Sequence, residues 1–236
     1  MNSIKSRLLV ELKSTFRNKR LKELFATIYF LVLINLILPW LLYYDIYFSG
    51  DNKLSVALQA SGWCIFVLSI VYASLSFNWQ GSYLPALCKS KKGVALTFTT
   101  AVLFPTLYSC LVFIIIFPSY YFLFPEASKW MMMFFLFNTG ILFPSVFTIS
   151  VLYNNKIIDL HKSRYLNFQG INLPNVMAIL VPLFILMILI GLSKYLLDDF
   201  YLLPNIFAIA GIMISLSFIS TLKKYFTKNI IQKLNY

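Results

Sequence analysis

The stretch Leu183-Phe184-Ile185-Leu186-Met187-Ile188-Leu189-Ile190 decides the fold class, because its eight apolar residues follow one another without a polar break. A strand of a membrane β-barrel would instead alternate apolar and polar side chains. The stretch belongs to a longer apolar run, residues 175–195, which can cross a hydrocarbon core of about 30 Å as an α-helix. Lipid offers no partner to free backbone N–H and C=O groups, so irregular chain is disfavoured there. The run therefore predicts a membrane-spanning helix.

The rest of the chain repeats this pattern. Of its 236 residues 60% are hydrophobic and 12% are charged, and the mean hydropathy is +0.79. Soluble domains average about 45–50% apolar and about 25% charged residues, so the composition excludes a water-soluble globule. We predict an all-α polytopic membrane protein: an amphipathic basic interfacial helix (1–23), a six-helix transmembrane domain (24–222) and a basic cytoplasmic tail (223–236). The six predicted transmembrane helices are residues 24–44, 54–77, 94–117, 130–152, 175–195 and 204–222.

The distribution of Lys and Arg predicts how these helices are oriented. If all six span the membrane, one side holds residues 1–23, 78–93, 153–174 and 223–236, with 17 of the 20 basic residues. The other side holds only Lys53, Lys129 and Lys194. Cytoplasmic loops are enriched in Lys and Arg, so we expect cytoplasmic N- and C-termini in a bacterial plasma (inner) membrane. This orientation also accounts for the net charge of +12 without a nucleic-acid partner.

The N-terminal segment has the pattern of a helix lying on the membrane. Its apolar residues Ile4, Leu8, Leu12 and Phe16 fall within one arc of about 140° on a helix. Basic amphipathic helices of this kind lie in the interface, and anionic lipids of the inner leaflet attract them. The alternative is a charged flank that only fixes the orientation of the first span.

The predicted cytoplasmic segment between the second and third spans, residues 78–93, is longer than a minimal turn. Ser82 could cap a short helix with Pro85 in its first turn, and such a helix could dock on a cytosolic partner. The alternative is an interfacial loop anchored by Trp79 and Tyr83. The candidate contact residues are Tyr83, Leu84, Leu87, Lys89, Lys91 and Lys92.

The second cytoplasmic loop, residues 153–174, adds the charged candidates Asp159, Lys162 and Arg164. The only histidine, His161, also lies there, and a lone histidine in a basic loop is more often a surface residue than a metal ligand. No P-loop motif is present, and the apolar cores of the runs hold no Asp, Glu, Lys, Arg or His. Membrane pumps and proton relays need such ionisable groups. We therefore expect no enzymatic activity and no cofactor.

Polar residues inside the runs have two interpretations. They either hydrogen-bond between helices or line a path across the membrane, and helix packing is the commoner role. Prolines inside four runs would kink the helices or simply be accommodated by neighbouring helices. The polar residues are Asn35, Gln59, Asn138, Thr139, Ser145 and Thr148, and the prolines are Pro39, Pro105, Pro144 and Pro182.

The order of these elements resembles the membrane subunit of ABC-2-type transporters. The sequence of residues 156–170, together with residues 77–83, is similar to an uncharacterised bacterial family of ABC-2-permease-like proteins, of which the chain would match one half. In ABC-2 transporters the loop between spans two and three carries a coupling helix that docks on the ATPase. Many exporters of this group place re-entrant helices between spans five and six, where this chain has only a short loop around residues 197–203.

This resemblance implies a permease-like subunit. It would form a translocation path with a second permease subunit, as a homodimer or a heteromer, and separate cytosolic ATP-binding subunits would power it. Membrane lipids are the remaining expected partners. The alternative is a non-transporting integral membrane protein, such as an immunity or assembly factor, that needs no contact with an ATPase.

Overall fold

A computed structural model describes residues 19–44, 56–57, 59–62, 64–66, 73, 90–153 and 173–234, together with residues 4, 6 and 9. These residues form six α-helices and one π-helical turn, which confirms the all-α class for the described part of the chain. The elements are α2 (Lys19–Tyr43), α5 (Lys91–Leu123), α6 (Pro125–Phe137), the π-helical turn η1 (Asn138–Leu142), α7 (Phe143–Tyr153), α8 (Leu173–Leu197) and α9 (Leu202–Leu234).

Four helical segments are long and apolar enough to cross a membrane, as expected of a multi-pass membrane protein. They are Lys92–Leu123, Pro125–Leu152, Leu173–Leu197 and Leu202–Lys228. The first predicted run lies in α2, and the described part of this helix contributes the apolar stretch Tyr29–Tyr43. The second run is described only in part, and its described residues are helical. The described part of the chain contains four candidate spans, and the total of six therefore remains a prediction.

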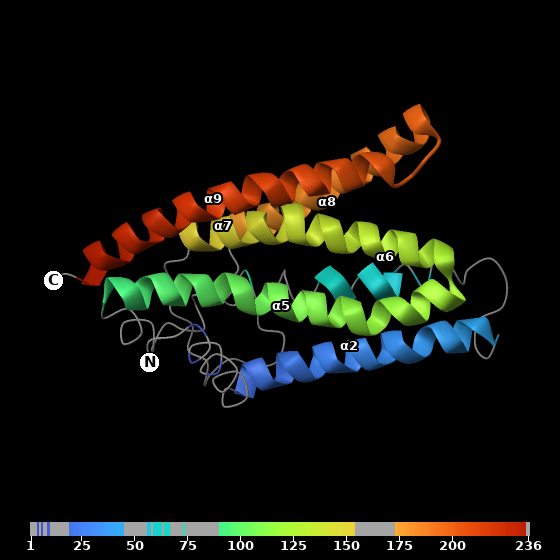
Figure 1. Ribbon diagram of the computed structural model, residues 1–236, viewed down its shortest axis with the longest axis horizontal. Coiled ribbons are helices and arrows are strands. Elements are labelled where there is room, and N and C mark those ends of the chain that lie inside the picture. Colours follow the sequence, from blue (N-terminus) through green and yellow to red (C-terminus); the bar gives the residue numbers. More distant parts are fainter. Residues whose placement is uncertain are drawn as a thin grey trace.

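The helices run alternately up and down the molecule (Figure 1). α5 and α8 run in one direction, and the α6–η1–α7 rod and α9 return in the other. α2 packs on α5, α5 also packs on α6 and α9, and α8 packs on α7 and α9. Because of this alternation, α5 begins and α9 ends at one end of the molecule, whereas α6 begins and α8 turns into α9 at the opposite end.

We call these two ends by the charges that their described residues carry. The basic end holds Lys92, Lys223, Lys224 and Lys228 near the start of α5 and the end of α9. The acidic end holds every acidic residue whose side chain the structure describes. These residues are Glu126, Asp198 and Asp199, and Lys129 and Lys194 accompany them.

The helices extend beyond the predicted apolar runs, and their connections are correspondingly short. Only Phe124 separates α5 from α6, and its N–H donates to the carbonyl of Tyr120 at 2.7 Å. Pro125 then starts α6, where its missing N–H costs nothing. Residues 198–201 connect α8 to α9, so the short loop expected there is confirmed. Asp198 has a φ of 53°, a left-handed conformation that Asp tolerates better than most residues.

The core consists of two apolar clusters. One joins α2 to the later part of α5 and the start of α6, around Leu42, Ile116 and Met131. The other joins the start of α5 to the η1–α7 region, α8 and α9, around Phe98 and Phe147. Such contacts hold membrane helices together by van der Waals packing rather than by exclusion of water. Phe66 and Phe134, with ring centroids 5.4 Å apart, lie against both clusters.

Burial is distributed unevenly among the four spans. In the most apolar 18-residue stretch, 39% of residues are buried in α5 and 44% in the α6–α7 rod, but only 22% in α8 and 11% in α9. α5 and the rod therefore form the centre of the described bundle. The α8–α9 hairpin lies at its side and exposes large side chains such as Phe184, Met187 and Ile214.

Candidate functional site

Most of the residues predicted to contact a cytosolic partner lie outside the described part of the chain. This applies to Tyr83, Leu84, Leu87 and Lys89 in the first cytoplasmic loop. Lys91 is the first residue of α5, and Lys92 is exposed in its first turn.

The other two predicted groups fall largely outside it as well. Asp159, Lys162 and Arg164 of the second loop are not among the described residues, and neither are Leu8, Leu12 and Phe16. Ile4 is helical, and 43% of its surface is exposed. These groups therefore stay predictions, and the described helices that adjoin the two loops in the sequence are α5, α7 and α8.

The start of α5 is held by a side-chain cap. Ser90 has an extended backbone, and its Oγ accepts a hydrogen bond from the N–H of Gly93 at 3.0 Å. A serine at this position satisfies a backbone donor that the helix itself leaves unpaired. Ser90 thus defines where α5 begins. The sequence pattern predicts only Ser82 as a cap, for a short helix earlier in the loop, and does not identify Ser90.

The first turns of α5 are attached to two other helices at the basic end. The ring of Phe98 lies 5.5 Å from that of Phe147 in α7 and 5.5 Å from that of Phe226 in α9. The next residue, Thr99, also lies beside α9, where its Oγ1 accepts a hydrogen bond from Lys223 Nζ at 3.1 Å. A movement of the start of α5 would therefore act on α7 and α9 directly.

The π-helical turn lies in the middle of the fourth predicted span. It begins at Asn138, which is fully buried and whose Nδ2 donates to the carbonyl of Ile65 at 3.5 Å. The hydrogen bond from Phe143 N–H to the carbonyl of Asn138 closes the wider turn. Such turns interrupt the regular α-helical ladder and are frequent at functional sites.

At this turn the backbone of the rod meets the backbone of α9. A Cβ added to Gly140 would lie 2.2 Å from the carbonyl oxygen of Ala208, and one added to Gly211 would lie 2.7 Å from the carbonyl oxygen of Gly140. Only glycine fits at either position. Small residues allow membrane helices to approach closely, and here two glycines fix where η1 crosses α9.

A second buried polar contact joins α2 to α5. Tyr120 donates its hydroxyl proton to Asn35 Oδ1 at 2.9 Å, and the Asn35 amide donates to the carbonyl of Leu31 at 2.9 Å. Tyr120 and Asn35 are both essentially inaccessible to solvent. Asn35 and Asn138 therefore bond between helices, and Thr139 bonds within its own helix to the carbonyls of Phe135 and Leu136.

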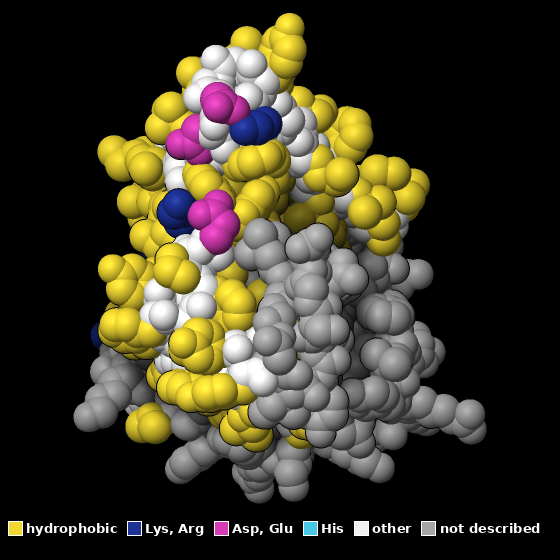
Figure 2. All heavy atoms as spheres, turned by 90° about the vertical axis from the view of Figure 1, so that its right-hand side faces the viewer, with side chains coloured by type: hydrophobic (Ala, Val, Ile, Leu, Met, Phe, Trp, Pro, Cys, Tyr) yellow, Lys and Arg dark blue, Asp and Glu magenta, His cyan; other side chains and the backbone are white. Residues whose placement is uncertain are grey.

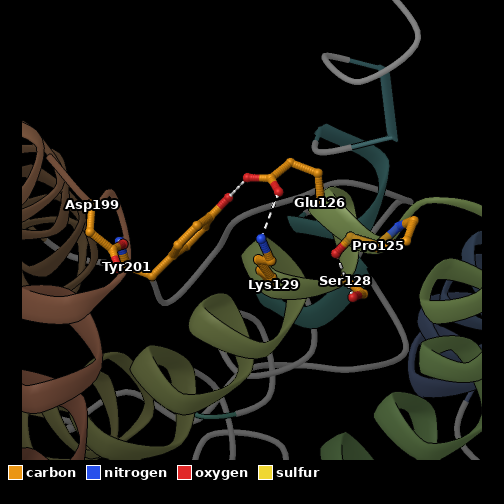
Figure 3. Close-up of polar contacts among 6 residues, drawn as sticks. All are labelled: Pro125, Glu126, Ser128, Lys129, Asp199 and Tyr201. Carbon is orange, nitrogen blue, oxygen red and sulfur yellow. Dashed lines mark hydrogen bonds and ion pairs between the residues drawn. The ribbon is translucent and has the colours of Figure 1, made fainter.

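Polar contacts at the acidic end tie the α8–α9 turn to the start of α6 (Figure 3). The carboxylate of Glu126 accepts one hydrogen bond from the Tyr201 hydroxyl and another from Lys129 Nζ at 3.0 Å. Partial burial raises the pKa of Tyr201, and the hydrogen bond to Glu126 raises it further. The phenol therefore stays neutral and remains a donor to the carboxylate.

Aromatic rings and a second ion pair complete this contact. The Trp130 ring lies 5.2 Å from Tyr201 and 5.7 Å from Phe200, measured between centroids. Lys194 pairs with Asp198 and lies 4.9 Å from the centroid of Phe200. The hydrogen bond from Lys194 lowers the pKa of Asp198, which therefore stays ionised. Figure 2 shows the charged side chains surrounded by apolar ones on this face.

These contacts are of the kind that hold helices in place. Within the described ranges, no group of three His, Cys, Asp or Glu side chains is placed to hold a metal ion. Cys64 is a free cysteine that is buried in the core. The charged side chains that the structure describes are all lysines at the basic end, and both acidic and basic at the acidic end.

Comparison with known proteins identifies a family. The sequence matches DUF5687, a family of unknown function, over residues 4–235, and the chain therefore belongs to this family. No curated protein and no solved structure matches it.

Proposed function

We propose that the chain is the membrane-spanning, permease-like subunit of an ABC-type transporter. It forms a translocation path with a second subunit, and separate cytosolic ATPases power it. The observation that carries this proposal is the way the first loop enters α5. Ser90 caps the helix, and within two turns Phe98 packs on both α7 and α9.

This attachment suits a coupling role for mechanical reasons. A loop that docks on an ATPase transmits work only if the helix that follows it is rigid and contacts the helices that move. α5 is a single helix of 33 residues, and it packs on α2, α6 and α9. A displacement of residues 78–90 would therefore reach both ends of the bundle through one element.

The path is proposed to lie between subunits rather than within one. The buried amides of Asn35 and Asn138 are engaged in contacts between helices of the same chain. The α8–α9 hairpin, by contrast, lies at the side of the bundle with most of its surface exposed. A second subunit could approach this side without displacing any described contact.

Co-purification with an ATPase tests the proposal. The tagged chain is co-expressed with a P-loop ATPase encoded beside it, and recovery of the ATPase is measured for the wild type and for Leu84→Asp with Leu87→Asp. We expect Leu84 and Leu87 to dock in an apolar groove of the ATPase. The double variant should therefore lose the ATPase, because two unpaired charges would be buried in that groove. The matched control is Leu196→Asp with Leu197→Asp. These two residues end α8 at the acidic end of the molecule, and both side chains are exposed.

The two outcomes separate the proposed functions. Loss of the ATPase in the first variant and its retention in the control support the permease-like subunit. Equal recovery in the wild type and in the first variant, with normal membrane insertion, removes the loop from the mechanism. The chain would then act as a non-transporting membrane partner, such as an immunity or assembly factor.

A further inference from the structure

A lysine at the basic end is held between two helices. Lys223 of α9 is half-buried, and its Nζ lies 3.1 Å from Thr99 Oγ1 of α5. The Thr99 hydroxyl donates its proton to the carbonyl of Ala95 at 2.8 Å, so its oxygen accepts from the ammonium. Thr99 thus positions the positive charge, but as a neutral group it does not balance it.

The charge is also not balanced by any acidic side chain that the structure describes. Glu126, Asp198 and Asp199 all lie at the acidic end, on the far side of the membrane-spanning region. The other lysines described at this end, Lys92, Lys224 and Lys228, are exposed and add further positive charge. Removing an ammonium from water is costly unless an opposite charge is near.

Lys92 lies on the face of α5 that carries Thr99. Lys92 precedes Thr99 by seven residues, which is two helical turns, so both lie on the same face of α5 about 10 Å apart along its axis. α9 passes this face in the opposite direction, with Phe226 against Phe98. The junction of α5 and α9 therefore includes Lys223, and Lys92 lies two turns closer to the start of α5 on the face that carries Thr99.

The depth of this junction matches that of lipid headgroups. Lys223 lies in the last two turns of the candidate span Leu202–Lys228, and only 11% of the apolar stretch of α9 is buried in the protein. Thr221, Lys224 and Tyr225 beside Lys223 are exposed, so the outer side of this turn of α9 can contact lipid. Basic sites between transmembrane helices near the membrane surface bind anionic headgroups.

We propose that the junction of α5 and α9 at the basic end binds the phosphate group of an anionic phospholipid. Lys223 donates to a phosphate oxygen, Thr99 holds the ammonium in position, and Lys92 adds a second cationic donor two turns closer to the start of α5. The site does not depend on whether the chain is a permease subunit, because it requires only the described helices and the surrounding bilayer.

The test measures lipid bound to the intact chain. The protein is placed in phosphatidylcholine nanodiscs that contain a minor fraction of phosphatidylglycerol, and retained phosphatidylglycerol is counted by native mass spectrometry. Lys223→Gln should lower its apparent affinity about fivefold, the effect expected of one lysine near a membrane surface. Lys223→Arg should retain binding, because it keeps the charge. Lys129→Gln, which removes a lysine at the acidic end, is the matched control.

Three results would overturn the proposal. The first is equal retention of phosphatidylglycerol by the wild type and Lys223→Gln, and the second is an equal loss in Lys129→Gln. The third is binding of inorganic phosphate in pure phosphatidylcholine nanodiscs with the same dependence on Lys223, which would make the site one for a free anion. The Arg variant keeps the test decisive if the Gln variant folds poorly.

Discussion

Gly140 is the residue whose substitution the structure constrains most sharply. Its Cβ would lie 2.2 Å from the carbonyl oxygen of Ala208, and backbone cannot move aside as a flexible side chain can. We expect Gly140→Ala to destabilise the protein by about 1–3 kcal/mol, as overpacking usually does. The measurement is the thermal unfolding midpoint in detergent.

The matched control for this substitution is Gly191→Ala in α8. No atom lies within 4 Å of a Cβ added at Gly191, and alanine is the better helix former by about 0.5–1 kcal/mol. This variant should therefore be neutral or slightly stabilised. Equal midpoints for the two variants would show that η1 and α9 do not touch as described.

The hydrogen bond between Tyr120 and Asn35 gives a second residue-level prediction. Tyr120→Phe removes the donor to Asn35 Oδ1 and leaves the ring in place. Hydrogen bonds between membrane helices contribute about 0.6 kcal/mol on average and at most about 1.7 kcal/mol, so a loss in this range is expected in a detergent unfolding titration. Tyr121→Phe, one position along and 54% exposed, should change nothing measurable.

Tyr120 also shows what the sequence could not reveal. Position alone, between the third and fourth apolar runs, would make Tyr120, Tyr121 and Trp130 anchors at the membrane interface. The structure turns Tyr120 inward toward Asn35 and leaves Tyr121 exposed. Adjacent residues on a helix point 100° apart, and a run that is apolar on every side gives no sign of which direction faces the neighbouring helix.

At the scale of elements, apolar runs located the spans but not the ends of the helices. The run 94–117 is part of α5, which continues to Leu123 through Pro118, and α6 begins at Pro125 rather than at residue 130. Hydropathy measures contact with lipid, whereas a helix continues as long as its backbone bonds are favourable. Asn138-Thr139-Gly140 interrupts its apolar run, but this short break does not by itself indicate a π-helical turn.

The cap of α5 supplies the prediction at this scale. Ser90→Ala removes the acceptor for the N–H of Gly93, which should cost about 1 kcal/mol and fray the first turn. Amide hydrogen exchange should therefore become faster at the first residues of α5, whereas exchange in the middle of the helix should not change. Ser90→Asp keeps an acceptor and should preserve the protection, and an equal loss in both variants would contradict the cap.

For the whole molecule, the separation of charge between the two ends agrees with the orientation that the Lys and Arg count predicts. Every acidic side chain that the structure describes lies at the end where α8 turns into α9, while Lys92, Lys223, Lys224 and Lys228 lie at the other end. Of the candidate coupling residues, Lys92 lies at this basic end, and Tyr83, Leu84, Leu87 and Lys89 lie outside the described ranges.

Thiol labelling in intact cells tests this orientation. In a background with its own cysteines replaced, Asp199→Cys lies at the acidic end and Lys92→Cys at the basic end, and both side chains are exposed. If the basic end faces the cytoplasm, as the positive-inside rule requires, a membrane-impermeant maleimide labels Asp199→Cys in intact cells and labels Lys92→Cys only after the cells are opened. Labelling of both positions in opened cells is the control for accessibility. The reverse pattern in intact cells would place the first loop outside, where no cytosolic ATPase could reach it, and would exclude the proposed coupling together with the orientation.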